Sequence, residues 1–560
     1  MDRNFILAMV LSMLVVTLWS STRPLPEPAE PKSPSATSET DAETARASEQ
    51  APAGERVPAG PRSERATFAA PAAFEPVLTT IGGERFRGRL STRGGTLIEY
   101  ALLDYMTTEM SGPKREIDLL SSERGPLEGA ATPFEELGLG NLRAAEFAIE
   151  DSSQNSVTYV LERDGVIVRK HFEFDLDGYT FTLGVAVQNT SGEVLYPRFE
   201  VEWPAAVQPG NDYAKISLIT RHDGEVARDL VPAVGSSGFL GIGGDDGAPL
   251  EGGVDWFGSD TTYFVGALVP QRGASANARF VPIVTGEIAA NVAAFEGIAL
   301  PSGNQITQEY KGYIGPKIEA DLKAFGSDLS MSIDRGWSWV QPLTRMFDWL
   351  LHAIYQVIPN YGWAIIVLTV MVRIVTLPII QTQMKSMEKM RSVQPRMKEI
   401  QEKYGDDREK QSQAMMALYK EEGVNPLGGC LPMLLQLPVF IGLFWSLQSS
   451  FELRNAPFML WMTDLSAPDQ LFVIPTPWGE VPFRVLPILM AGSMVLQAKL
   501  QPMSPDPAQA QMMTTIMPIM MLFLFYQFPS GLVLYYALSN FLGIAHQRWV
   551  GRNMKLNQAT

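Results

Sequence analysis

Five apolar runs near the end of the chain constrain its fold more than any other feature. They cover residues 363–380, 431–447, about 485–496, 512–528 and 531–545. A helix needs about 20 residues to cross roughly 30 Å of hydrocarbon, so the shorter runs require a thinned bilayer or snorkelling flanks. A sixth run at 5–19 follows Arg3 and lacks a small-residue cleavage site, which favours an uncleaved anchor over residues 1–22. The pattern predicts a membrane α-helical bundle with six transmembrane helices.

The charges are divided unequally between the two parts of the chain. Residues 1–360 hold 29 basic and 48 acidic side chains, whereas residues 361–560 hold 16 and 13. The acidic excess argues against binding by bulk positive charge, so we expect no direct nucleic-acid specificity. The single cysteine, Cys430, excludes a disulfide framework and a cysteine-cluster metal site. We expect no metal and no cofactor.

The distribution of Lys and Arg around the apolar runs predicts the orientation in the membrane. One set of loops holds thirteen of these residues: nine in 381–427, Lys499, and three in the tail after the last run. The opposite loop, 448–484, holds only Arg454 and Arg484. Because Lys and Arg concentrate on the cytoplasmic side, both termini are expected in the cytoplasm and residues 68–333 outside it.

Residues 23–333 divide into a linker and a globular domain. Residues 23–67 are rich in Pro, Ala, Ser and Glu and predict a flexible linker. Residues 68–333 predict an all-β sandwich, because short strands alternate with turn residues. Asp164-Gly165 and Asp177-Gly178 each indicate a two-residue hairpin turn, and residues 198–203 alternate as a strand buried on one face.

Residues 334–560 complete the predicted organisation. Residues 334–359 predict an amphipathic helix on the membrane surface, with Trp337, Trp339 and Trp349 as interfacial anchors; an ordinary amphipathic core helix is the alternative. Residues 360–550 form the predicted five-helix core, which includes a cytoplasmic helical hairpin at 381–427. Residues 551–560 form a short basic tail.

Arg373 is the most informative polar residue of the apolar runs. A guanidinium at that depth costs at least about 2.5–3.5 kcal/mol on insertion scales, so it should face protein or water. Snorkelling to the cytoplasmic surface is the alternative. Thr369 lies one helical turn earlier, Gln436 lies within another run, and Ser539 and Asn540 add polar groups to the last one. Each alone is typical of a helix–helix hydrogen bond, and together they indicate a hydrated groove.

Residues 381–427 predict two helices broken at 405–407. Apolar residues recur there at steps of three and four: Met384, Met387, Met390, Val393, Met397 and Ile400. The stripe indicates a hairpin that packs on itself. It is also compatible with a soft surface that receives varied hydrophobic segments, because methionine adapts its shape.

No pattern of catalytic residues indicates an enzyme. The four histidines are scattered, and no H-E-x-x-H or phosphate-binding loop occurs. A polytopic transporter or channel with an exported accessory domain is an alternative function, but repeat symmetry is expected there. An intramembrane protease would need a catalytic pair that the sequence lacks.

Three stretches of the second half resemble one protein family. Residues 425–438 (Asn-Pro-Leu-Gly-Gly-Cys-Leu-Pro-Met-Leu-Leu-Gln-Leu-Pro), 415–420 and 528–536 closely resemble the YidC family of membrane protein insertases, which is shared with mitochondrial and chloroplast insertases. The likeness spans about 334–550. The layout of anchor and exported domain resembles the Gram-negative branch, in which the periplasmic domain would be supersandwich-like.

The resemblance implies an insertase and chaperone without catalytic residues, which inserts and helps fold inner-membrane proteins through a groove open to cytoplasm and lipid. Arg373 would attract acidic residues in the translocated tail of the substrate. The implied groove comprises Thr369, Arg373, Gln436, Tyr535, Tyr536 and Asn540. The implied hydrophobic slide for the substrate comprises Leu437, Phe440, Phe523, Leu524 and Phe525. The hairpin, with Met384, Met387, Met390, Met397, Asp406 and Asp407, would receive the nascent chain.

The resemblance also implies partners and a location. The partners would be nascent membrane proteins, the lipid bilayer, and the Sec translocon with its accessory subunits. A ribosome would bind weakly through the cytoplasmic loops, because only 12 residues follow Arg548. The location would be the bacterial inner membrane, with the large domain in the periplasm.

Overall fold

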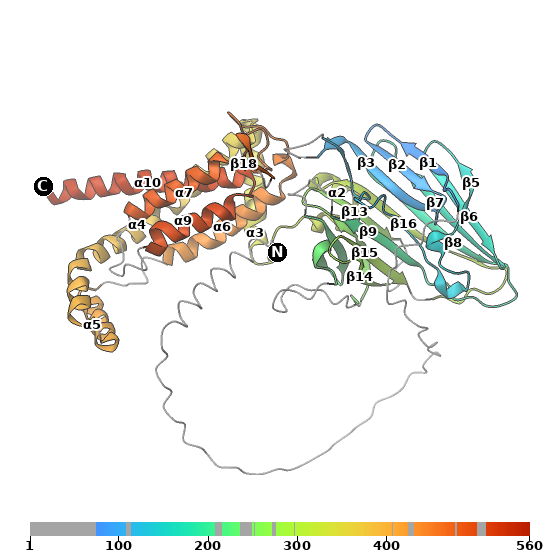
Figure 1. Ribbon diagram of the computed structural model, residues 1–560, viewed down its shortest axis with the longest axis horizontal. Coiled ribbons are helices and arrows are strands. Elements are labelled where there is room, and N and C mark those ends of the chain that lie inside the picture. Colours follow the sequence, from blue (N-terminus) through green and yellow to red (C-terminus); the bar gives the residue numbers. More distant parts are fainter. Residues whose placement is uncertain are drawn as a thin grey trace, which may run out of the picture. The chain divides into compact units, whose positions relative to one another are not determined.

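The computed structural model describes residues 74–107, 114–207, 215–235, 249–250, 252–271, 276–295, 297–405, 407–423, 431–476, 479–500 and 511–559 (Figure 1). The expected anchor at 1–22, the expected linker at 23–67 and Asp406 lie outside the described residues. The same holds for the side chains of Met384, Met387, Met390 and Gln436.

Three antiparallel sheets build the β-rich domain, which confirms the predicted sandwich. The first has the order β1 (Leu78–Gly82), β2 (Phe86–Ser91), β3 (Thr96–Met106), β4 (Glu116–Asp118). The second has nine strands in the order β11 (Glu225–Leu230), β10 (Ser217–His222), β12 (Val254–Asp260), β13 (Phe264–Pro270), β16 (Gln305–Pro316), β8 (Thr180–Asn189), β7 (Val166–Phe174), β6 (Ser156–Arg163), β5 (Ala148–Ser152). The third has the order β14 (Ala276–Val284), β15 (Ile288–Phe295), β9 (Glu200–Ala206). Large side chains from all three sheets share one core, including Phe86, Trp256 and Phe295.

The two predicted hairpin turns have different outcomes. Asp164 and Gly165 connect β6 to β7 with φ of 51° and 75°, and Arg163 pairs with Val166 across them. This is the two-residue turn that the sequence predicts, because both central residues occupy the left-handed region. The second hairpin joins β7 to β8, but its last pair is Phe174 with Phe181, so its turn is longer than the predicted two residues.

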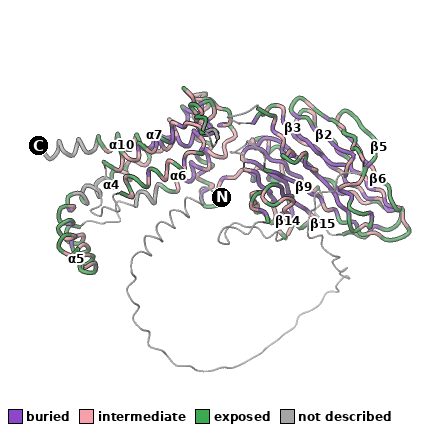
Figure 2. The backbone as a smooth tube through the Cα atoms, viewed as in Figure 1, coloured by how far each residue is buried: buried purple, intermediate pink, exposed green. Residues whose placement is uncertain are grey.

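The strand around Trp203 is buried on both faces, so the predicted half-buried strand is wrong. Only the first residue of β9 is partly exposed, and the Glu202 side chain is buried with its carboxylate paired to Arg143. The alternation of polar and apolar residues is real, but the polar face is covered by protein rather than by water. Figure 2 shows β9 within the buried part of the domain.

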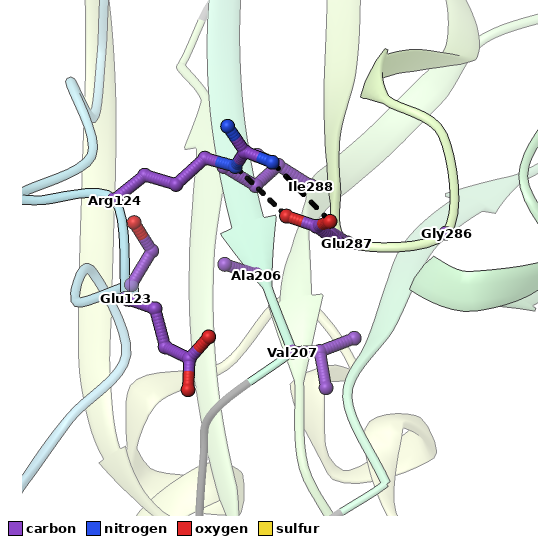
Figure 3. A pocket seen from close by; sticks show the side chains of 8 residues that line it. Glu123, Arg124, Ala206, Val207, Gly286, Glu287 and Ile288 are labelled. Carbon is purple, nitrogen blue, oxygen red and sulfur yellow. Dashed lines mark hydrogen bonds and ion pairs between the residues drawn. The ribbon is translucent and has the colours of Figure 1, made fainter.

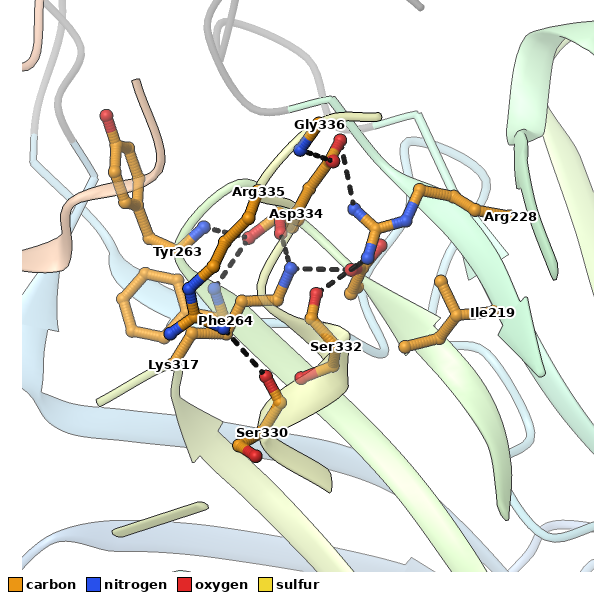
Figure 4. Close-up of polar contacts among 12 residues, drawn as sticks. Ile219, Arg228, Tyr263, Phe264, Lys317, Ser330, Ser332, Asp334, Arg335 and Gly336 are labelled. Carbon is orange, nitrogen blue, oxygen red and sulfur yellow. Dashed lines mark hydrogen bonds and ion pairs between the residues drawn. The ribbon is translucent and has the colours of Figure 1, made fainter. Parts of the chain in front are cut away.

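A buried polar cluster lies where the chain leaves the β domain for the helical half (Figure 4). Lys317 Nζ donates to Asp260 Oδ2 at 2.5 Å and to the Thr261 carbonyl at 2.7 Å. Arg228 contacts the same Asp260 oxygen at 3.0 Å and donates to the Ser332 carbonyl at 2.6 Å. The cluster therefore fixes the chain that runs from β16 through α2 (Glu319–Phe325) and the short 3-10 helix η5 (Leu329–Ser332).

Helices form at the apolar runs of the second half. They are α3 (Gln341–Val357), α4 (Tyr361–Lys403), α5 (Arg408–Glu421), α6 (Leu431–Ser449), α7 (Val485–Leu500), α9 (Met517–Phe525) and α10 (Ser530–Ala559). A π-helix, η8 (Met512–Ile516), precedes α9, and the strands β17 (Phe472–Thr476) and β18 (Gly479–Phe483) form a hairpin before α7. Buried side chains from α3, α4, α6, α7, α9 and α10 form a second core.

Helix α4 joins the first apolar run of this half to the expected cytoplasmic hairpin without a break. Asn360 is the N-cap of the helix, and its side-chain oxygen accepts the Trp363 N–H at 3.1 Å. The helix continues through Pro378 and Pro395 to Lys403. Among the described helices, only Tyr361–Pro378 is long and apolar enough to cross a bilayer by itself. Leu437–Ser449, Val485–Leu500 and Met512–Phe525 are shorter apolar helices, so six transmembrane helices remain a prediction.

Candidate functional site

The loop between α6 and α7 forms hydrogen bonds with the N-terminal ends of α4, α7 and α10. Asp469 is buried, and one of its oxygens accepts the Val485 and Leu486 N–H groups at 2.8 and 3.0 Å. The Trp461 indole N–H donates to the same oxygen at 3.2 Å. Asp469 therefore caps α7 and ties the loop to it.

The same loop reaches α10 and α4. The Ser530 hydroxyl donates to the Asp464 carbonyl at 2.8 Å, and the Gly531 N–H donates to the Leu465 carbonyl at 2.9 Å. At the start of α4, the Tyr361 hydroxyl donates to Glu452 at 2.7 Å. The bundle is therefore covered by a hydrogen-bonded loop at the end where α4, α7 and α10 begin.

Arg373 lies three helical turns into α4, on the side that faces α10. Its guanidinium donates to the Ser539 carbonyl, and a Cβ built on Gly543 would lie 3.7 Å from both of its terminal nitrogens. Its Nε is buried without a hydrogen-bond partner among the described residues. Since the described ion pairs give Arg373 no carboxylate, its charge is only partly satisfied.

The other predicted groove residues differ in their burial and in their hydrogen-bond partners. Thr369 is fully buried, and its hydroxyl donates to the Ile365 carbonyl of its own helix at 2.6 Å. Asn540 donates to the Ser493 hydroxyl at 3.1 Å, which ties α10 to α7. Tyr535 is buried, and Tyr536 is half-buried. Arg373 therefore contacts Ser539 of α10, the helix that also carries both tyrosines, while Thr369 and Asn540 serve contacts within or between helices.

The predicted hydrophobic slide is exposed at only two of its five residues. Leu437 is 50% exposed and Phe523 is 75% exposed. Phe440 and Leu524 are half-buried. Phe525 is buried and packs on Phe528 with ring centroids 5.0 Å apart, so it is a core residue rather than part of an open surface. The reason is helical geometry, because residues two positions apart on one helix point in different directions.

The expected cytoplasmic hairpin packs through a small apolar cluster. Met397 and Val393 of α4 pack with Leu418 of α5, and all three are buried. Asp407 caps α5, accepting the Lys410 N–H at 3.1 Å. The Lys410 side chain next to it lowers the pKa of the Asp407 carboxyl. Met416 is 68% exposed on α5, so the hairpin both packs on itself and presents methionine to its surroundings.

No metal-binding cluster of three or more His, Cys, Asp or Glu side chains occurs among the described residues. The β domain has a small hollow of about 150 Å³, and its lining includes Arg124 and Glu287, which form an ion pair (Figure 3). Both charged side chains are more than half exposed. The hollow lacks the convergent buried polar groups of a binding site.

Two residues of α10 near Arg373, Gly543 and His546, are not among the residues predicted for the site. Gly543 lies against the guanidinium, and His546 follows it three residues later on α10. Tyr535, Ser539, Gly543 and His546 recur at steps of four, four and three, and this spacing puts them on one face of α10. The same spacing rule could have grouped them from the sequence.

Matches to known proteins cover almost the whole chain. A family model described as the YidC periplasmic domain matches residues 78–350, and one described as the 60Kd inner membrane protein matches residues 353–558. The membrane protein insertase YidC of Pseudomonas aeruginosa strain LESB58 is 31% identical over 593 residues, covering 98% of this chain and 97% of the relative. The insertase of the same name from Haemophilus influenzae strain Rd is 32% identical, covering 85% of this chain and 86% of the relative.

Solved structures also resemble the chain. A crystal structure of an active YidC insertase with its first transmembrane domain resolved covers 84% of this chain and 93% of its own, with a TM-score of 0.35 and 19% identity. A putative aldose 1-epimerase from Escherichia coli K12 covers 43% of this chain and 99% of its own, with a TM-score of 0.28 and 12% identity. Likenesses this distant assign no chemistry to the chain.

Proposed function

The chain belongs to the YidC family of membrane protein insertases, and from this premise we propose that it inserts substrates through a groove centred on Arg373. Family membership makes it an inner-membrane insertase with a periplasmic β domain. Its substrates are nascent membrane proteins, and its surroundings are lipid. No feature of the described residues favours the alternative of a transporter or channel.

One observation carries the proposal: Arg373 is a fixed positive charge without an acidic partner among the described residues. A guanidinium stays protonated and attracts carboxylates more strongly in a low-dielectric site than in water. Such a charge suits transient binding of acidic residues in a substrate tail. The loop that covers the starting ends of α4, α7 and α10 supports a groove that is closed toward the periplasm.

The proposed topology has six spans with both termini in the cytoplasm. Thirteen Lys and Arg residues on one side against two on the other support this orientation. The loop from 450 to 484 would then lie in the periplasm, and the hairpin of α4 and α5 would lie in the cytoplasm. In this orientation Arg373 would be reached from the cytoplasm.

The substrate's hydrophobic segment would leave along the exposed residues Leu437 and Phe523. Its partition into lipid would drive the step, and for acidic tails the membrane potential would add about 2.3 kcal/mol per charge per 100 mV. The hairpin would receive the nascent chain. Docking of the β domain to the Sec translocon and weak ribosome contact through the cytoplasmic loops are further parts of the proposal.

Site-specific crosslinking to a stalled nascent membrane protein tests this path. Probes at Leu437 and Phe523 should crosslink to the substrate's apolar segment, whereas a probe at the buried Phe525 should not. Insertion without crosslinks from the two exposed positions would contradict the proposed path.

Charge variants test the role of Arg373. Arg373→Ala should impair a substrate with an acidic tail by roughly tenfold and the same substrate with a neutral tail much less, since about 1.4 kcal/mol of attraction corresponds to that factor. Arg373→Lys should keep part of the activity, because it keeps the charge but not the planar fork. Equal losses for both tails would remove the attraction from the proposal.

A further inference from the structure

Two buried polar atoms beside the groove have no hydrogen-bond partner among the described residues: Arg373 Nε and His546 Nε2. An unsatisfied buried donor or acceptor costs about 1–3 kcal/mol, so such an atom in a native protein calls for a functional or solvent partner. Arg373 Nε–H can only donate, and an imidazole Nε2 donates when it carries the proton. One acceptor group that reached both atoms would meet both needs.

The two atoms belong to neighbouring positions on the α4–α10 surface. The Arg373 guanidinium donates to the Ser539 carbonyl and lies alongside Gly543. His546 follows Gly543 by three residues, so it is the next side chain on that face of α10. The guanidinium therefore lies against the face of α10 that carries His546, about one helical turn before it.

Contacts around His546 place it at the end of the groove where α7 ends. The Trp549 ring stacks near the imidazole with centroids 6.4 Å apart. The neighbouring Gln547 side chain donates to the Leu500 carbonyl at 3.1 Å and so ties this part of α10 to the last turn of α7. Because α7 ends here and α10 continues, His546 lies at the opposite end of the bundle from the loop that covers α4, α7 and α10.

We propose that His546 and Arg373 form one carboxylate site, in which an acidic side chain of the substrate accepts hydrogen bonds from both. This deepens the proposed function and rests on it: Arg373 supplies the charge, and His546 supplies a second donor that orients the carboxylate. A carboxylate has two oxygens and accepts from two donors at once. His546 therefore makes the groove selective for acidic residues over neutral ones and sets where along α10 they bind.

Insertion assays with the full chain in proteoliposomes test the site with two substrates that differ only in Asp or Asn in the translocated tail. His546→Phe keeps a ring of similar shape but removes both nitrogens, and it should lower insertion of the Asp substrate by roughly fivefold while leaving the Asn substrate within about twofold. His546→Gln keeps an N–H donor and should restore most of the Asp insertion. In an Arg373→Ala background, His546→Phe should add little further loss, because both residues serve the same ligand.

His352 on α3 provides a matched control, since it is half exposed and contacts Glu452 rather than Arg373. His352→Phe should change the two substrates by the same factor. If His546→Phe also lowers both substrates equally, or if His546→Gln fails to restore Asp insertion, the carboxylate site is wrong. The Arg373→Ala arm separates this from the proposed function: acidic selectivity lost in Arg373→Ala but unchanged in His546→Phe overturns only the shared site.

Discussion

The β domain buries the positive side chain of Lys317 and the helical half partly buries that of Arg373, and the two side chains have different partners. Lys317 in the β domain contacts a carboxylate and a carbonyl, and the same carboxylate binds Arg228. Arg373 in the helical half contacts one carbonyl and no carboxylate among the described residues. A fully paired buried charge holds a fold in place, whereas a partly paired one keeps capacity for a ligand. We therefore propose that Lys317 is a structural cation and that Arg373 is a functional one.

Removing the shared carboxylate of the β domain should have the largest effect. Asp260→Ala leaves Lys317 buried without its anion and should lower the free energy of unfolding of the β domain by about 3–5 kcal/mol. Thermal unfolding of the full chain in detergent, followed by limited proteolysis of the β domain, measures the loss. Glu287→Ala is the matched control, because solvent screens its exposed pair with Arg124 and its loss should hardly change stability. Equal losses in the two variants would contradict a structural role for the cluster.

Removing Arg373 should lower insertion and leave stability almost unchanged, whereas removing Asp260 should lower stability. Arg373→Ala deletes a charge that has no acidic partner among the described residues, so stability should change by less than about 1 kcal/mol while insertion of acidic-tailed substrates falls. Thermal unfolding and insertion are measured on the same preparation. A large loss of stability with unchanged insertion would make Arg373 a structural cation and break the comparison.

The buried ionisable groups of the β domain predict a pH-dependent stability. Burial raises the pKa of Glu202 to about 7 and lowers the pKa of Lys170 to about 7. Between the unfolded pKa of Glu202 and pH 7 the folded state binds more protons, so stability falls as pH rises. Above pH 7 the unfolded state binds more protons through Lys170, so stability rises again.

The β domain should therefore be least stable near pH 7. Glu202→Gln should remove the fall between about pH 5 and pH 7, an effect on the order of 2 kcal/mol. Thermal midpoints of both proteins across this range provide the measurement. A wild-type stability that rises steadily from pH 5 to pH 7 would show that Glu202 is ionised in the folded state.

The smallest effect is expected in the cytoplasmic hairpin, where charges are exposed. Arg396 on α4 pairs with Glu421 and Glu422 on α5, and about half of its side chain is exposed. Arg396→Ala should hardly change the stability of the hairpin, because solvent screens such pairs. Met397→Ala should loosen it more, since Met397 is buried against Leu418. Protease cleavage between α4 and α5 ranks the two variants, and the reverse order would contradict this reading of the hairpin.

Local pattern predicted much of the helical half and part of the β domain. The apolar runs form helices, Asp164-Gly165 forms a two-residue turn, and the sequence shows that Arg373 is a charged residue within an apolar run. The second turn, at Asp177-Gly178, failed because turn residues alone do not fix the length of a connection. The strand around Trp203 failed because alternation shows which side chains share a face, not what covers that face.

The sequence by itself determined which segments are apolar, where charge is scarce and which positions can turn, because these depend on neighbours along the chain. Only the tertiary structure decided that Phe525 is core and Phe523 is exposed, that Asn540 binds Ser493, and that Arg373 meets Ser539 and Gly543. The Arg373–Ser539 contact joins α4 to α10 across 166 residues of chain, and the Asn540–Ser493 contact joins α10 to α7 across 47. Local periodicity tells which face of a helix a residue occupies, but only packing decides what that face meets.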